Sequence, residues 1–168
     1  MSLDILFIHP NASKKIYQGL SNNHSAIEPP IWAGMLANHC RKKNFNVEIL
    51  DCEAEKLDYI SGATEIKNRK PRVACFVVYG QQPSASSQNM EGAVATSQEL
   101  KKLEPSIKTI FVGGHISALP KETLSSESSI DFVALNEGVY AISNLLKIQN
   151  LDEEKYIKKV KGIGYKDK

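Results

Sequence analysis

Polar and glycine-bearing segments follow four short apolar runs of this sequence. Their residues are His9, Pro10, Asn11, Tyr79, Gly80, Gln81, Gln82, Gly113, Gly114, His115, Asn136, Glu137 and Gly138. Amide, hydroxyl and imidazole groups can satisfy the polar groups of a ligand, and glycine lets a ligand approach the main chain because no Cβ intervenes. Together the segments predict one shared binding site. Taken singly, each has another reading, since glycine pairs serve ordinary turns and Glu137 would favour a helix N-terminus.

The sequence lacks the motifs of several common catalytic and nucleotide sites. HPNASKK at 9–15 is neither GxGxxG nor GxxxxGK[ST], and no serine stands in GxSxG. His9, His24 and His115 are not spaced as a metal triad. The three cysteines are Cys40, Cys52 and Cys75, without a CxxC pair. We therefore expect no catalysis by this chain alone, and a reduced, cytoplasmic protein.

Length and charge restrict the class of protein. A chain of 168 residues that is 42% apolar predicts one globular domain. The net charge of +2 is spread along the chain, so neither nucleic acid nor an anionic membrane is expected as a partner. The apolar run in MSLDILFIHP is too short for a signal peptide or a membrane span.

Short apolar runs alternate with helix-length segments, a pattern typical of strand–helix units on a parallel sheet covered on both faces. Strands are predicted at 3–8, 46–50, 72–78, 107–112 and 130–135. Helices are predicted from Pro29 and Pro30 to about 43, over about 53–68, 88–103 and 139–148, with a short turn after Pro120. The pattern predicts an open doubly wound sheet of about five strands, a flavodoxin-like three-layer sandwich.

The domain is expected to cover residues 1–150, and residues 151–168 to form a linker or a short edge strand, the latter at 160–165. In sheets of this kind, ligands bind at the carboxyl ends of the strands. The polar segment of about twenty residues after the first strand exceeds the ~2 to 6 residues of an ordinary connection. A functional loop is the preferred interpretation, and a disordered loop is the alternative. The loop after the third strand could instead cap the next helix.

Six segments in order carry a family resemblance. They read FIHPN, PPIWAGMLANHCRKKNFNVEILD, VVYGQQ, IKTIFVGGHISALPKETL, IDFVALNEG and VKGIGY. This succession resembles the N-terminal cobalamin-binding domain of cobalamin-dependent radical S-adenosylmethionine enzymes. The group it resembles contains the anaerobic magnesium-protoporphyrin IX monomethyl ester cyclase and related methyltransferases. The family positions fall on Pro29, Pro30, Asp51, Tyr79, Gly80, Gln82, Gly113, Gly114, Asn136, Glu137 and Gly138.

The sequence also departs from related patterns. One residue of the family's GGPH is missing beside His115, and Asn136 replaces a glycine. Cobalamin domains of the methionine synthase and mutase type carry DxHxxG, whose histidine binds cobalt from below, but here the aspartate is Phe7 and the glycine is Ala12. A metal-bound histidine normally needs an acceptor that fixes its ring, which Phe7 cannot supply. Cobalamin without a histidine beneath cobalt is therefore expected, with His9 as cobalt ligand the alternative.

The resemblance implies a cobalamin-binding domain that is inactive alone. It implies a parent polypeptide with a C-terminal radical S-adenosylmethionine domain, a 4Fe-4S cluster and S-adenosylmethionine, acting in methyl transfer or oxidative cyclisation. One alternative is a flavodoxin-like regulatory or protein-interaction domain without a cofactor. An exposed apolar patch near Trp32 or Tyr79, with no pocket at the strand ends, would favour that alternative. A flavin or nucleotide site is a further alternative.

Overall fold

A computed structural model describes residues 2–11, 29–80 and 83–166 of the chain. Within these residues, one sheet has the strand order β2-β1-β3-β4-β5-β6. The strands are β1 (Ile5–His9), β2 (Val47–Asp51), β3 (Val73–Val78), β4 (Lys108–Gly113), β5 (Phe132–Ala134) and β6 (Ile163–Tyr165). Strands β1 to β5 are parallel, and β6 pairs antiparallel with β5. The five predicted parallel strands and their flavodoxin-like order are confirmed, and β6 adds a short sixth strand at the edge of the sheet.

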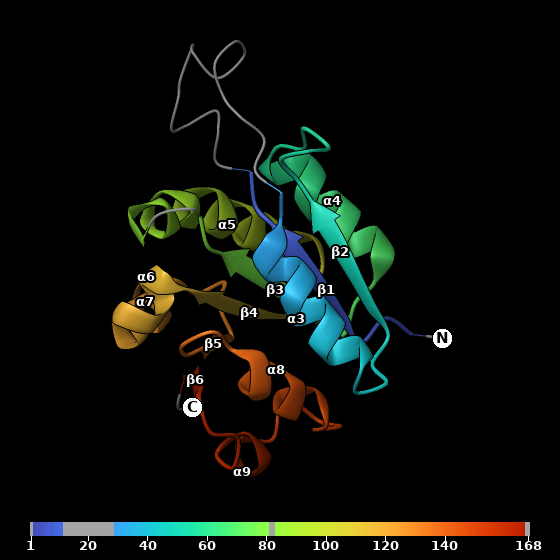
Figure 1. The fold of residues 1–168 in the computed structure, drawn as a ribbon, viewed down its shortest axis with the longest axis vertical. Helices are drawn as coiled ribbons and strands as arrows, with labels where there is room; N and C mark the ends of the chain where they lie inside the picture. The colour runs from blue at the N-terminus through green and yellow to red at the C-terminus, as the bar shows by residue number, and fades with distance from the viewer. Residues whose placement is uncertain (1, 12–28, 81–82, 167–168) are drawn as a thin grey trace.

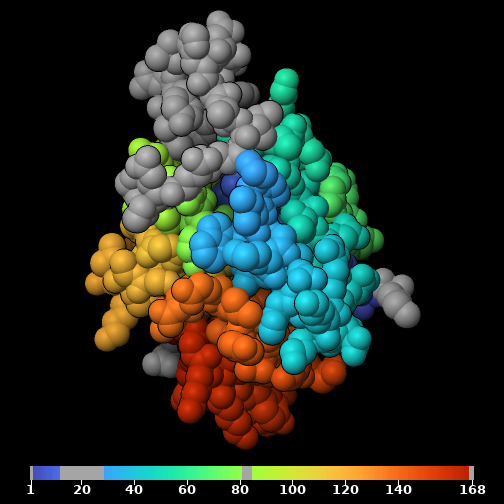
Figure 2. All heavy atoms as spheres, viewed as in Figure 1, coloured from blue at the N-terminus to red at the C-terminus, as the bar shows by residue number. Residues whose placement is uncertain are grey.

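Helices cover both faces of the sheet (Figure 1). Their bounds are α3 (Ile31–Arg41), α4 (Tyr59–Arg69), α5 (Pro83–Leu103), α6 (Gly114–Ala118), α7 (Pro120–Ser126), α8 (Val139–Leu146) and α9 (Glu154–Ile157). One apolar cluster joins α3, α8 and α9 to the sheet, and a second joins α4, α5, α6 and α7 to its other face. Figure 2 shows α3, in blue, on the surface of the first face. No helix in the described part of the chain is both long and apolar enough to cross a bilayer.

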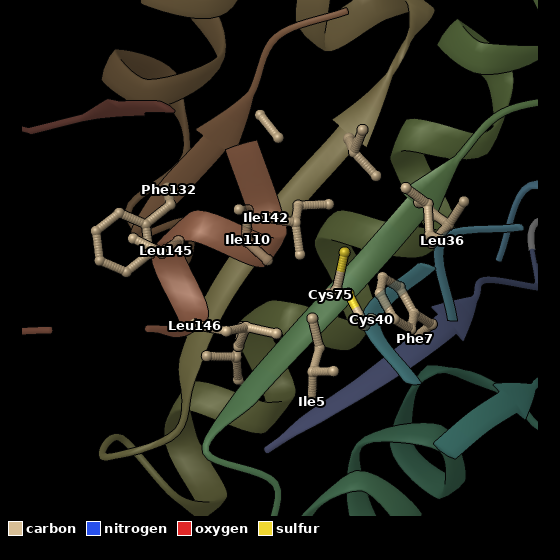
Figure 3. Close-up of a cluster of buried hydrophobic side chains, with 14 of the residues drawn as sticks. Ile5, Phe7, Leu36, Cys40, Cys75, Ile110, Phe132, Ile142, Leu145 and Leu146 are labelled. Carbon is tan, nitrogen blue, oxygen red and sulfur yellow. The ribbon is translucent and has the colours of Figure 1, made fainter. Parts of the chain in front are cut away.

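Alternate residues of the central strands pack against opposite helix layers. On β1, Ile5 and Phe7 belong to the first cluster, and Leu6 and Ile8 belong to the second. Figure 3 shows part of the first cluster, with Phe7 beside Cys40 and Cys75. Full burial of a side chain as large as Ile, Leu or Phe contributes about 1.5–3 kcal/mol to the free energy of folding. Because both faces are buried, these strands read as continuous apolar runs rather than as alternating ones.

The cysteines behave as small apolar side chains of the core. All three are buried and free. Burial raises the pKa of Cys40 to about 11, and burial with the nearby charge of Asp51 raises the pKa of Cys52 to about 12. Near neutral pH these thiols therefore stay protonated and poorly nucleophilic.

Helix α4 begins at Tyr59, so the predicted start at 53 was wrong. Asp58 caps the helix by accepting a hydrogen bond from Ser61 N at 2.9 Å, and the Asp58 N–H donates to Ser61 Oγ at 2.9 Å. This capping box fixes the first turn six residues later than the predicted start. Ile60, the second residue of the helix, is 50% exposed.

Three further helices differ from the prediction. Helix α5 starts at Pro83 rather than at 88, and proline suits a first helical position because it lacks an N–H that would be unpaired there. The expected loop after the fourth strand is helix α6, which begins directly at Gly114. The turn expected after Pro120 is helix α7, again with proline in its first turn.

Arginines from both helix layers cover the outer edge of β2. The Asn46 carbonyl, just before β2, faces β1 and accepts a hydrogen bond from Ile5 N. Because successive carbonyls of a strand point to opposite sides, those of Val47 and Ile49 face the open edge. Arg41 Nη2 donates to Val47 O at 3.0 Å, and Arg69 Nη1 donates to Ile49 O at 3.3 Å. The outward-facing carbonyls of Val47 and Ile49 are therefore satisfied.

Candidate binding site at the carboxyl ends of the strands

A hollow of about 320 Å³ opens at the carboxyl ends of β1 and β3, beside the first turn of α3. Its lining residues are His9, Pro29, Pro30, Ile31, Trp32, Ala33, Val77, Tyr79 and Gly80. The hollow lies at the edge of the sheet at which binding was predicted. Its volume is near the lower end of the ~300–1,000 Å³ typical of small-molecule sites.

A stacked aromatic pair forms one wall of this hollow. The rings of Trp32 and Tyr79 lie 4.4 Å apart between centroids, with 20° between their planes. Trp32 stays 36% exposed, so its ring is available to a ligand. Burial and the nearby charge of Glu137 raise the pKa of Tyr79 to about 12, so its phenol keeps its proton at neutral pH.

His9 ends β1 inside the hollow and is 7% exposed. Its Nε2 lies 3.4 Å from Glu53 Oε2, a carboxylate on the turn that follows β2. Phe7 supplies no acceptor to this ring, as expected, but Glu53 offers one from another segment. The lack of an aspartate at position 7 therefore does not by itself argue against His9 as a ligand. Phe7 itself is buried in the first core cluster.

The neighbours of His9 are used in fixing the fold. Pro10 is buried. Asn11 Nδ2 donates to Leu57 O at 3.1 Å, which ties the end of β1 to the turn before α4. The rest of the predicted first loop, residues 12–28, lies outside the described residues, as do Gln81 and Gln82.

The double glycine serves two different purposes. A Cβ on Gly113 would lie 2.1 Å from Val78 O, so this position must be glycine for β3 and β4 to approach. A Cβ on Gly114 would meet nothing closer than 3.7 Å, and Gly114 is exposed. Of the pair, Gly114 presents bare main chain at the surface.

Buried Ser86 holds the same junction together. Its Oγ donates to Val78 O at 2.5 Å and accepts from His115 N at 3.0 Å. One hydroxyl therefore joins the end of β3, helix α5 and the start of α6. The His115 ring points elsewhere, with Nδ1 2.9 Å from Ser87 Oγ, and lines a second hollow of about 470 Å³ between α5 and α7.

The segment after β5 is joined to the hollow through Tyr79. Asn136 has φ +54° and Gly138 has φ +68°, so both are left-handed. The Tyr79 hydroxyl donates to Asn136 O at 2.9 Å. Asn136 and Glu137 are exposed, and Gly138 is buried.

The structure thus brings His9, Tyr79 and Gly80 into one hollow, attaches Asn136 to it, and places His115 on another. The sequence analysis missed the roles of Ser86 and Glu53, and it treated Trp32 only as part of an exposed patch. A signal for Trp32 was present, since the only tryptophan of the chain follows Pro29 and Pro30 at a helix start. Among the described residues, no group of three or more His, Cys, Asp or Glu side chains could hold a metal ion.

Comparison with known families adds a direct assignment. Residues 19–146 match the model of the B12 binding domain, which is more than half of the chain. The chain belongs to the B12-binding domain family. The matched residues of this B12-binding domain include α3, β2 to β5 and α8, whereas His9, Pro10 and Asn11 lie before them. Since B12 is cobalamin, the predicted relation to cobalamin-binding domains is confirmed at the level of the family.

The B12-binding domain also has a distant relative among curated proteins. It is 24% identical over 139 residues to an uncharacterized methyltransferase of Pyrococcus horikoshii. The alignment covers 83% of this chain and 28% of the relative, so the chain spans about 28% of that protein's length.

Proposed function

We propose that this domain binds cobalamin over the carboxyl ends of its parallel strands and serves a radical S-adenosylmethionine enzyme. The observation that carries the proposal is the hollow with its aromatic wall at that edge, in a chain of the B12-binding family. The alternative of a cofactor-free interaction domain required an apolar patch without a pocket. Here Trp32 and Tyr79 line a pocket.

The residues at this edge suit part of a corrinoid. Trp32, Val77 and Tyr79 offer apolar walls to a flat ring or base, and the hollow is large enough for only a portion of so big a group. The exposed side chains of Asn136 and Glu137 can hydrogen-bond its peripheral amides, and the bare main chain of Gly114 permits close approach. Gly80, Gln82, Gly113 and Gly138 are added to the proposed set by family resemblance. The candidates His9, Pro10, Asn11, Gln81 and His115 rest only on their position after the strands, and the His115 ring lines the other hollow.

We assign no catalytic residue to this chain. Bound cobalamin would supply a cobalt centre that carries a methyl group or exchanges one electron. Because the relative from Pyrococcus horikoshii is named a methyltransferase, we favour methyl transfer over cyclisation for the parent. The 4Fe-4S cluster and S-adenosylmethionine are proposed to reside in a C-terminal domain of the same polypeptide.

His9 is proposed to orient part of the hollow rather than to bind cobalt. Only 7% of His9 is exposed, which leaves little of its ring open to a cobalt centre in the hollow. The Glu53 carboxylate holds the imidazole against the turn after β2.

Binding itself is tested by incubating the domain with hydroxocobalamin and separating it from free corrinoid by gel filtration. We expect the corrin absorbance to elute with the protein, whereas flavin mononucleotide offered in the same way should not. Coelution of flavin but not corrin would favour the flavin alternative. Absence of corrin from the protein fraction, both for this domain and for the longer parent, would overturn the proposal.

The role of His9 is tested by electron paramagnetic resonance of bound cob(II)alamin in protein uniformly labelled with ¹⁵N. If a protein nitrogen binds cobalt, the label will convert the triplet splitting from that nitrogen into a doublet, because ¹⁴N has nuclear spin 1 and ¹⁵N has nuclear spin 1/2. We expect labelling to leave the spectrum unchanged, as should His9→Ala. A doublet that disappears in His9→Ala would establish His9 as the ligand.

A further inference from the structure

Three strand-end segments meet at a single main-chain oxygen. The carbonyl of Asn136, after β5, accepts a hydrogen bond from the Tyr79 hydroxyl, after β3, at 2.9 Å. It also accepts one from Ser117 Oγ, on α6 after β4, at 3.3 Å. A carbonyl oxygen has two lone pairs, and here side chains from two different segments use them.

The turn that presents this carbonyl is conformationally defined. Asn136 and Gly138 are both left-handed, and a Cβ on Gly138 would lie 2.9 Å from Val112 Cγ2. Gly138 N donates to Leu135 O at 3.2 Å, and Leu135 N donates to Gly162 O at 2.9 Å. The base of the segment is thus fixed by its own main chain, whereas the direction of its exposed tip, Asn136 and Glu137, depends on the two side-chain donors.

Tyr79 connects this tip to the wall of the hollow. Its ring stacks on Trp32, and its hydroxyl holds the Asn136 carbonyl. Asn89 Nδ2 donates to Tyr79 O at 3.0 Å, which anchors the tyrosine's own main chain to α5. Displacing the tip would therefore break a bond to a residue that is itself held from two sides.

We propose that the hydroxyls of Tyr79 and Ser117 are positioning groups that jointly hold Asn136 and Glu137 at the mouth of the hollow and thereby raise its affinity for cobalamin. This inference rests on the proposed function. The two hydroxyls act through the Asn136 carbonyl, and neither has to touch the ligand. Because either donor alone still restrains the carbonyl, loss of both releases the tip.

A double-mutant cycle tests this coupling. We measure the hydroxocobalamin dissociation constant of Tyr79→Phe, Ser117→Ala and the double variant. We expect about threefold weaker binding for the first, about twofold for the second and about twentyfold for the double variant, in the range of one or two neutral hydrogen bonds. A double variant near sixfold, the product of the single effects, would show independent residues and overturn the inference.

Matched variants separate positioning from general stability. Tyr156→Phe on α9 and Ser125→Ala on α7 remove hydroxyls from exposed parts of the surface and should leave the dissociation constant unchanged.

Hydrogen exchange of the ligand-free domain gives a second readout, in which the double variant should speed exchange at Asn136 and Glu137 while the melting temperature changes little. Unchanged exchange there would overturn the inference whatever the ligand data show. Failure of the wild-type domain and its longer parent to bind would instead count against the proposed function.

Discussion

Gly113→Ala is expected to lower the free energy of unfolding by about 3 kcal/mol, the upper range for overpacking a buried site. The new Cβ would lie 2.1 Å from Val78 O, 2.8 Å from Val78 C and 3.1 Å from Ser86 Oγ. Two of these atoms are main chain of the neighbouring strand, so β3 and β4 would have to separate. Urea denaturation followed by circular dichroism measures the change.

The next residue provides the matched control. In Gly114→Ala the nearest atoms to the new Cβ are both in the Ser86 side chain at 3.7 Å, an ordinary contact. Alanine also favours helix over glycine by up to about 1 kcal/mol, and Gly114 is the first residue of α6. We therefore expect a stability within about 1 kcal/mol of the wild type. Equal destabilisation by the two substitutions would contradict the close approach at Gly113.

Trp32→Ala is expected to weaken cobalamin binding at least about tenfold, which corresponds to about 1.4 kcal/mol. The substitution removes the outer ring of the aromatic wall and leaves Tyr79 without its stacking partner. Stacked aromatic pairs contribute about 0.5–1.5 kcal/mol beyond the area they bury. Titration of the domain with hydroxocobalamin, read from the corrin spectrum, gives the dissociation constant.

Two variants make this result specific. Trp32→Phe keeps an aromatic ring at the wall and should recover most of the affinity. Tyr156→Ala removes an exposed aromatic ring from α9 and should change nothing. If Trp32→Ala bound cobalamin as tightly as the wild type, the hollow beside α3 would not be the site.

The strands were predictable because burial on both faces leaves a strong signal in the sequence. Each residue of β3 from Val73 to Val78 is buried, so the strand reads as an unbroken apolar run. Helix starts were harder, because a single local contact decides them. The capping box of Asp58 and Ser61 sets the start of α4 at Tyr59, whereas the prediction placed it at about 53.

The site was predictable as a place but not as a set of contacts. Parallel strands bring their carboxyl ends to one edge, so polar segments after β1 and β3 had to be neighbours. Sequence spacing does not report side-chain direction, however. The contact between His9 and Glu53 spans 44 positions, and the contact between Tyr79 and Asn136 spans 57. His115 follows the same edge yet turns toward Ser87, away from the hollow.

The guanidinium groups of Arg41 and Arg69 at the open edge of β2 affect how readily this domain aggregates. A bare sheet margin is a template on which a foreign strand, or a neighbouring molecule, can continue the ladder into fibrils. Here an incoming strand would first have to break the hydrogen bonds from Arg41 to the Val47 carbonyl and from Arg69 to the Ile49 carbonyl. Crowded copies of the domain should therefore resist fibrillisation along this side.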